Sequence, residues 1–436
     1  MSASQRLIDL VPSAKKSSIY SHISSNIILK IVDILFILFI YINIISPGPL
    51  PVVFTVKKIL FGILLLVSLL YNVLRIQKYS ISNMNYLFFV FSSTLTMALI
   101  SLFKGNEMNN ILKYVFPIMF FLFIPILESL YKNYSIERYL QHILYGGLVL
   151  SFIVLSVVFI SEILNFREIT LFFPNEGENR TNISISYPLD SIRVQAQTGV
   201  FLAASLCIAL YFSGIYRSKY YYIIIPCILS AVYFTKTIGI WGACVFVIIA
   251  YLIKKKNYLI NTIVVLIFLF IVFFIQSSVI TDLRQQEEKD ASFRNKKQQI
   301  YSGLELFFEK PIFGQGIGYI FRGVDERSDY NESVIENTPI LILSTGGLYG
   351  VTIYAFIYLY PVMLFFLKKR KSIIPKILII SHMSILIAGF SNPYILAGGM
   401  GLFFPVLYLS FKMHKQSRSD ESGEPRPVGL IPSSVS

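Results

Sequence analysis

Long apolar runs are the feature that most limits how this chain can fold. Many of them reach about 20 residues, the length that an α-helix needs to cross the hydrocarbon core of a bilayer. Of the 436 residues, 55% are hydrophobic and only 14% are charged, whereas a soluble domain carries about 25% charged residues. The sequence therefore predicts an all-α, polytopic integral membrane protein.

We expect about twelve transmembrane helices, forming a single domain over residues 1–412. Their predicted ranges are 27–46, 58–77, 84–103, 111–131, 140–164, 196–216, 220–235, 238–253, 257–277, 338–367, 373–391 and 394–412. The following stretch, 413–436, is rich in Ser, Pro and charged residues and has little apolar surface to bury. We expect it to be a disordered cytoplasmic tail.

The distribution of Lys and Arg predicts the orientation of these helices. With the N-terminus in the cytoplasm, every cytoplasmic turn carries basic residues, as the positive-inside rule expects. These residues are Arg75, Lys78, Lys132, Arg138, Arg217, Lys219, Lys254 to Lys256, Lys368 to Lys371, Lys412, Lys415 and Arg418. Lys57 and Lys58, at a short outer turn, are an exception. Two long loops, 165–195 and 278–337, then face outward.

Composition also bears on partners and cofactors. The net charge of +14 comes mostly from basic clusters between apolar runs, so we interpret it as a topology signal and not as nucleic-acid binding. Cys207, Cys227 and Cys244 lie inside apolar runs without paired spacing, which indicates neither a disulfide framework nor a metal site. No cofactor is indicated. His382 lies mid-span, and we expect it to be a hydrogen-bonded core histidine.

The stretch from Arg294 to Gly350 belongs to the most densely charged region of the chain. Ile300, Leu304, Phe307 and Phe308 recur at helical spacing, and Pro311 follows. The pattern predicts an amphipathic helix that ends at the proline and lies along the membrane surface. The outward loop 278–337 is therefore where we look for polar chemistry.

Glycines and a capping sequence follow this predicted helix. Gly314, Gly316 and Gly318 predict a flexible turn. Asn337 or Thr338 can cap the next helix, and Pro339 suits its first turn. Further along, Gly346 and Gly350 have the spacing of small residues at a close helix contact.

The candidate catalytic residue is a carboxylate, because no histidine falls in an outward loop. Glu336 stands at the start of an outward-originating helix, where the helix dipole favours its ionised form. Glu332 is the competing candidate, and a solvated loop glutamate is the alternative interpretation. Arg193 begins the helix predicted near 196–216, and Arg294 begins the predicted amphipathic helix. Both therefore stand near the outer interface, where they either bind phosphate oxygens or anchor the chain at the bilayer. Lys236 occupies a short outward turn.

Several motifs together resemble the O-antigen ligase and polymerase superfamily. Glu336-Asn337, nine residues and then Gly347-Leu-Tyr-Gly350 is similar to the H-N-x9-G-x-x-G pattern of the ligases, with Glu in place of His. The run from Arg294 through EKPIFGQGIGYI resembles the segment that precedes this motif in the wider superfamily. TKTIGIWGA, which includes Lys236, and RVQAQTGVFLAASL, which begins at Arg193, are similar to two further family segments.

The resemblance implies a membrane-embedded glycosyltransferase that uses oligosaccharides on undecaprenyl diphosphate as donor and acceptor. Glu at the histidine position favours a repeat-unit polymerase of the O-antigen or capsule pathway. The implied location is a bacterial inner membrane, with the active site facing the periplasm or exterior. Arg193 and Arg294, with Lys236 and Arg322, would hold the diphosphate, and Glu336 would be the base.

The implied reaction is a metal-independent, single displacement that inverts the anomeric carbon. Besides membrane lipid, a chain-length regulator is a candidate partner. Two alternatives stay open: an O-antigen ligase that transfers glycan to lipid A core, and a flippase for the lipid-linked oligosaccharide. A flippase should have charges within its spans facing a central cavity, whereas most of the notable charges here fall in outer loops.

Overall fold

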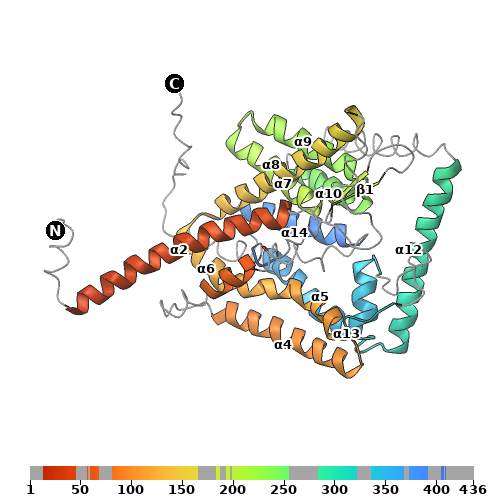
Figure 1. Cartoon of the computed structure of the whole chain (residues 1–436), viewed down its shortest axis with the longest axis horizontal. Helices are drawn as coiled ribbons and strands as arrows, with labels where there is room; N and C mark the ends of the chain where they lie inside the picture. Colours follow the sequence, from red (N-terminus) through yellow and green to blue (C-terminus); the bar gives the residue numbers. More distant parts are fainter. Residues whose placement is uncertain are drawn as a thin grey trace.

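The computed structural model of the protein describes residues 13–45, 56, 59–67, 81–164, 183–186, 193–196, 199–254, 283–321, 335–367, 373–390, 404–406 and 408. These parts of the chain are almost entirely helical and include one two-stranded sheet. The predicted span 257–277, most of 394–412 and the predicted tail 413–436 lie outside the described residues. Figure 1 shows the helices gathered into one bundle.

The helices follow the apolar runs. In chain order they are α2 (Ser13–Ile45), α4 (Ile81–Phe103), α5 (Met108–Met119), α6 (Ile124–Asn133), α7 (Ile136–Val158), α8 (Val200–Tyr216), α9 (Tyr221–Thr235), α10 (Ile238–Lys254), α12 (Leu283–Glu309), α13 (Thr338–Leu367) and α14 (Ile373–Gly389). A 3-10 turn, Phe120–Phe123, joins α5 to α6, and a π-helical turn, Phe159–Ile163, extends α7.

Five helical stretches within the described residues are long and apolar enough to cross a membrane. They are Ile27–Ile45, Asn83–Phe103, Met108–Asn133, Ile136–Ile163 and Thr338–Leu364. Each coincides closely with a predicted span. Four shorter apolar helices, Val200–Tyr216, Tyr221–Thr235, Gly239–Leu252 and Ile374–Gly389, also fall where spans are predicted. A predominantly helical membrane protein is thus confirmed, while the count of twelve stays a prediction.

A short hairpin differs from the helical prediction. Strands β1 (Ile183–Ser186) and β2 (Arg193–Ala196) pair antiparallel, with Ser186 opposite Arg193. The expectation that Arg193 begins the helix at 196–216 is therefore wrong, because α8 begins only at Val200. Four residues that alternate polar and apolar side chains, as Arg-Val-Gln-Ala does, suit a strand better than the start of a buried helix.

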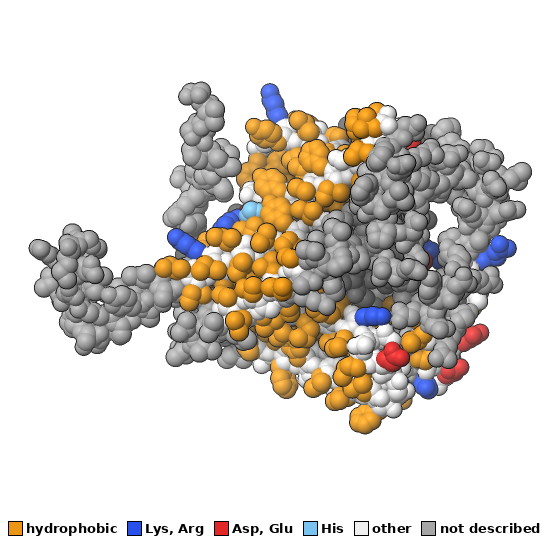
Figure 2. Space-filling model, viewed as in Figure 1, with side chains coloured by type: hydrophobic (Ala, Val, Ile, Leu, Met, Phe, Trp, Pro, Cys, Tyr) orange, Lys and Arg blue, Asp and Glu red, His pale blue; other side chains and the backbone are white. Residues whose placement is uncertain are grey.

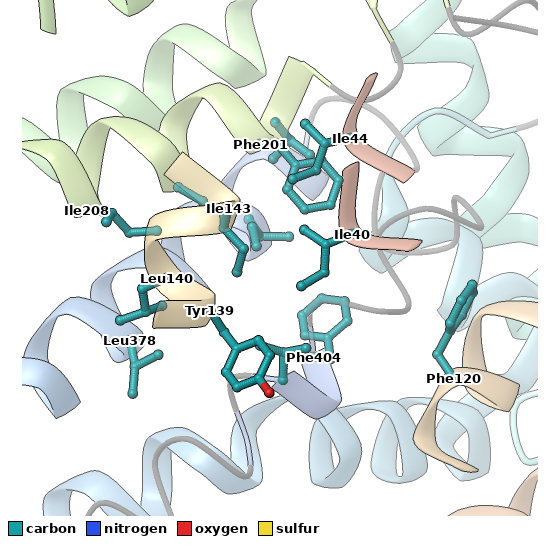
Figure 3. Packing of buried hydrophobic residues seen from close by; sticks show 14 of the residues in the cluster. Ile40, Ile44, Phe120, Tyr139, Leu140, Ile143, Phe201, Ile208, Leu378 and Phe404 are labelled. Carbon is teal, nitrogen blue, oxygen red and sulfur yellow. The ribbon is translucent and has the colours of Figure 1, made fainter. Parts of the chain in front are cut away.

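The core is the packed interior of the bundle. Helix α8 contacts α7, α10 and α14, and α2 packs on α7. Figure 3 shows Ile40, Ile143, Phe201 and Leu378 from four of these helices converging on one apolar cluster. Large apolar side chains also remain exposed on the outside of the bundle, and they cover much of the face in Figure 2. Such a surface suits contact with lipid.

Helix α12 runs crosswise to α4 along one edge of the bundle (Figure 1). It starts at Leu283, earlier than the predicted start at Arg294, and ends at Glu309 just before Pro311. It packs against α13. Phe308 is 73% exposed, and its contact with lipid at a membrane surface stays a prediction. This helix and the start of α13 hold the candidate site.

Candidate functional site

Glu336 lies immediately before α13, next to the residue that caps this helix. The Asn337 side-chain Oδ1 accepts a hydrogen bond from the backbone N–H of Ile340 at 3.1 Å. Its Nδ2 donates to the backbone carbonyl of Phe390 at 2.9 Å. The predicted N-cap is therefore confirmed at Asn337. The two hydrogen bonds of the Asn337 side chain hold in place the residue next to Glu336.

Two side chains of α12 hold Glu336. The ammonium group of Lys296 lies 3.2 Å from Glu336 Oε2, and the two side chains are 39% and 34% exposed. The side-chain oxygen of Gln299 accepts a hydrogen bond from the Glu336 backbone N–H at 3.0 Å. Gln299 itself is buried. The carboxylate is thus half-exposed and ion-paired, and it stands on a backbone that is held from the adjacent helix.

Arg294 lies on the same helix but on a different side. Its side chain is exposed. Residues two positions apart point to different sides of an α-helix, so Arg294 does not share the face from which Lys296 reaches Glu336. The predicted role of Arg294 in binding the diphosphate stays a prediction.

Arg193 and Lys236 belong to a second group of elements. Strand β2, which contains Arg193, packs against α9 and α7. Lys236 ends α9 in a left-handed conformation with φ of 46° and is half-buried in the two-residue turn before α10. Figure 1 shows α12 running along the edge of the molecule from the level of β1 to the level of α13. Arg322 and Glu332 lie outside the described residues.

Helix α13 is broken at Gly347. This residue has φ of 61° and ψ of −160°, a combination that is not helical and that is open almost only to glycine. A Cβ atom here would lie 2.5 Å from the amide nitrogen of Gly314 and 2.6 Å from the carbonyl oxygen of Ile312. Both the backbone shape and the close approach therefore require glycine at this position.

The segment after α12 docks into this break. We call residues 311–318 the glycine loop. Its Gln315 and Gly316 N–H groups donate to the carbonyls of Ser344 and Thr345 at 2.8 and 2.7 Å. In return, the N–H groups of Leu348 and Tyr349 donate to the carbonyls of Pro311 and Ile312 at 2.9 and 3.0 Å. Four backbone hydrogen bonds therefore join the loop to α13. They satisfy polar groups that an unbroken helix would pair internally.

The three glycines of the loop each approach a different backbone. An added Cβ would lie 2.5 Å from the backbone of α13 at Gly314 and 2.6 Å from the first turn of α5 at Gly318. At Gly316 it would lie 2.4 Å from the side-chain nitrogen of Asn106 and 3.1 Å from Cα of Ser101 in α4. All three have positive φ. The prediction of a flexible turn is therefore wrong, because the glycines serve close packing. For Gly346 the prediction of a close helix contact is also wrong, because an added Cβ there would meet no atom within 4 Å.

Two polar residues after α4 secure the glycine loop. The ammonium group of Lys104 donates to the carbonyls of Phe313 and Gly314. Asn106 Nδ2 donates to the carbonyls of Gln315 and Ile317 at 3.1 and 3.3 Å. Burial lowers the pKa of Lys104, and the positive charge of Lys310 lowers it further. The loop is thereby held from α4 as well as from α13.

A cavity of about 540 Å³ opens beside the glycine loop. Its lining comes from the turn after α4, one side of α12 and the segment after the loop: Gly105, Asn106, Glu107, Ser302, Glu305, Leu306, Glu309, Gly318, Tyr319, Ile320 and Phe321. The lining contains the three carboxylates of Glu107, Glu305 and Glu309. Carboxylates accept hydrogen bonds from hydroxyl groups and repel anions. The lining therefore suits a neutral, hydroxyl-rich group better than a phosphate.

Fold and site together define a helical membrane protein with a carboxylate placed at the start of a span and supported by an amphipathic helix. Residues 202–355 match the family model described as O-antigen ligase. This match spans 154 of the 436 residues and supports the resemblance to the O-antigen ligase and polymerase superfamily. The family comprises glycosyltransferase-like enzymes. No curated protein matches the chain. The matched range contains Lys236, Arg294, Glu336 and the glycine loop, and it starts after Arg193.

Sequence reasoning missed several residues of this region. The sequence pattern gives Lys296 and Gln299 no role, although their three-residue spacing places them on one side of a helix. Gly347 was noted only within a motif. The sequence does not show which of the adjacent glycines Gly346 and Gly347 breaks the helix. Only the positive φ of Gly347 distinguishes them.

Proposed function

We propose that the protein is an extracytoplasmic glycosyltransferase that polymerises undecaprenyl-diphosphate-linked oligosaccharide repeat units into O-antigen or capsular polysaccharide. The proposal rests on the family of residues 202–355 and on one observation above all. Glu336 replaces the histidine of the ligase motif and stands half-exposed, ion-paired and backbone-anchored at the start of α13. A carboxylate held in this way can receive a proton from a substrate bound in front of it.

In the proposed reaction, Glu336 takes the proton of an acceptor sugar hydroxyl. The hydroxyl oxygen forms a bond to the anomeric carbon of the donor. The bond from that carbon to the diphosphate oxygen breaks, and its electron pair stays with the diphosphate. Arg193, Arg294, Lys236 and Arg322 are proposed to hold this diphosphate and to stabilise the charge that it gains. A single displacement of this kind inverts the anomeric carbon.

Positioning and charge stabilisation would supply most of the rate enhancement, because the diphosphate is already a good leaving group. The sugars are the hydroxyl-rich part of the proposed substrate. The cavity between α12 and the turn after α4 offers them carboxylate, hydroxyl and aromatic side chains. The substrate's anionic part would be repelled from the same cavity.

The second candidate is an O-antigen ligase, and the description of the matched family favours it directly. A ligase would use the same donor and transfer the finished glycan to lipid A core. The two candidates differ in the acceptor. They therefore differ in which product accumulates when the enzyme is inactive.

Glu336→Gln tests the proposal in cells. Gln keeps the size of the side chain and most of its hydrogen bonding but accepts no proton at neutral pH, so turnover should collapse while the protein is still inserted. An inactive polymerase should leave surface lipid that carries one repeat unit. An inactive ligase should leave polymer on the lipid carrier and none on the core, and an inactive flippase should leave single units in the cytoplasm.

Gel profiles of surface glycan and analysis of the lipid-linked pool separate these outcomes. Glu332→Gln serves as the neighbouring control and should leave long chains. Normal long chains from Glu336→Gln would remove this carboxylate from the mechanism. Long chains from Glu336→Gln together with their loss from Glu332→Gln would move the base to Glu332.

A further inference from the structure

We infer that Lys296 and Gln299 are positioning residues that hold Glu336 in the orientation from which it accepts the proton. The inference rests on the proposed function, because it assigns roles to residues around the proposed base. The sequence motifs described above give neither residue a role. Both are identified by their contacts.

The two contacts act on different groups of the same residue. Lys296 holds the carboxylate itself, with 3.2 Å between Nζ and Oε2. Gln299 holds the backbone, through the 3.0 Å hydrogen bond from the Glu336 N–H. One fixed point on the backbone and a second on the side chain leave the torsions between them little freedom. Glu336 is therefore oriented before any substrate arrives, which is the preorganisation that proton transfer needs.

The packing of α12 on the start of α13 explains why these two residues reach Glu336. Gly303 lies one turn beyond Gln299 on the same side of α12. A Cβ atom at Gly303 would lie 2.5 Å from a side-chain methyl of Ile340 and 2.9 Å from one of Ile335. The absence of a side chain at Gly303 thus lets α12 lie close to the segment that carries Glu336. The contacts of Lys296 and Gln299 follow from this fit.

The neighbouring residues of α12 differ in their surroundings. Lys297 is exposed, and its ammonium group lies over the ring of Tyr301 at 5.7 Å. Gln298 is half-buried on another side of the helix. Two adjacent residues of the same chemical types therefore serve as matched controls for Lys296 and Gln299.

A half-exposed ion pair contributes little to folding. Replacing Lys296 should therefore leave the amount of inserted protein unchanged. The replacement should slow the chemical step, since displacing a catalytic carboxylate by about 1 Å can lower the reaction rate up to roughly a hundredfold. We expect Lys296→Met to lower the turnover number about tenfold, within that limit, and to change KM little. Lys296→Arg restores a cation of similar reach and should recover most of the rate.

The experiment uses the full chain in nanodiscs and, as probe, the lipid-linked repeat unit extracted from the native strain. Turnover number and KM are measured for Lys296→Met, Lys296→Arg and Gln299→Leu, with Lys297→Met and Gln298→Leu as controls. The inference expects losses in Lys296→Met and Gln299→Leu, rescue by Lys296→Arg and normal rates in both controls. If Gln299→Leu reduces the yield of folded protein, the Lys296 variants decide the outcome alone.

Three results would overturn the inference. They are a normal rate in Lys296→Met, an equal loss in Lys297→Met, and a failure of Lys296→Arg to recover activity. Glu336→Gln in the same assay separates this failure from failure of the proposed function. An inactive Glu336→Gln beside a fully active Lys296→Met rejects the positioning role only, whereas an active Glu336→Gln rejects the base itself.

Discussion

Gly347→Ala should undo the docking of the glycine loop into α13. An L-residue at φ of 61° and ψ of −160° is strained by about 1–3 kcal/mol. The added methyl would also lie within 2.6 Å of the backbone of Ile312 and Gly314, so the loop must move away. Four backbone hydrogen bonds join the loop to the break, and each contributes about 0.5–1.5 kcal/mol. Loss of half of them together with the strain gives a destabilisation of about 2–6 kcal/mol.

The matched control is Gly346→Ala. Gly346 precedes the break, its φ is not positive, and an added Cβ would meet no atom within 4 Å. Alanine there should be neutral or stabilising, by up to about 1 kcal/mol, because it is the better helix former. The assay is thermal unfolding of both detergent-purified variants, followed by size-exclusion chromatography, with surface glycan measured in the same strains. Equal melting temperatures for Gly347→Ala and the unmodified protein would refute this account of the break.

Three further predictions concern orientation, diphosphate binding and the bundle interior. Ser302→Cys should react with a membrane-impermeant thiol reagent in intact spheroplasts, because positively charged cytoplasmic turns flank the loop 278–337; labelling only after permeabilisation would reverse the topology. Arg294→Lys should lose much of the activity while Lys297→Ala keeps it, since one ammonium group does not reproduce a bidentate guanidinium contact; wild-type polymer from Arg294→Ala would make the arginine an anchor only. Arg138→Ala leaves the buried carboxylate of Asp33 without the cation at 2.8 Å. It should lower stability by about 2 kcal/mol, less than a fully buried pair would, because the Arg138 side chain is 38% exposed; an unchanged melting temperature would contradict this.

The positions of the spans were predictable because hydrophobic length decides them. The predicted helix 84–103 corresponds to Asn83–Phe103, and 338–367 contains the span Thr338–Leu364. The N-cap Asn337 and the end of α12 before Pro311 were also predictable, since both depend on local backbone chemistry. His382 is buried and its ring contacts the carbonyl of Tyr358, as expected of a core histidine.

The contacts between segments were not predictable in the same way. Each glycine of the loop, considered alone, predicts backbone freedom. The need for glycine becomes visible only when three other segments of the chain pack against the loop. The prediction that Arg193 begins a helix was wrong for a related reason. Its strand exists because β1 supplies the partner, and a run of four residues carries too weak a pattern to indicate pairing by itself. The ion pair of Glu336 likewise depends on how α12 lies on α13.

The glycine loop and the carboxylate belong to one mechanical unit, because α12 is tied to α13 at two places. Near its end, Gln315 Nε2 donates to the carbonyl of Leu306 at 3.1 Å, while the Gln315 N–H donates to Ser344 of α13 at 2.8 Å. The other tie is the contact of Lys296 with Glu336. Ten residues separate Lys296 from Leu306, which at about 1.5 Å per residue places the ties about 15 Å apart. One tie would leave α12 free to pivot, whereas two fix its tilt. A change at Gly347 that releases the loop should therefore tilt α12 and displace Lys296 from Glu336, so activity should fall even in molecules that remain folded.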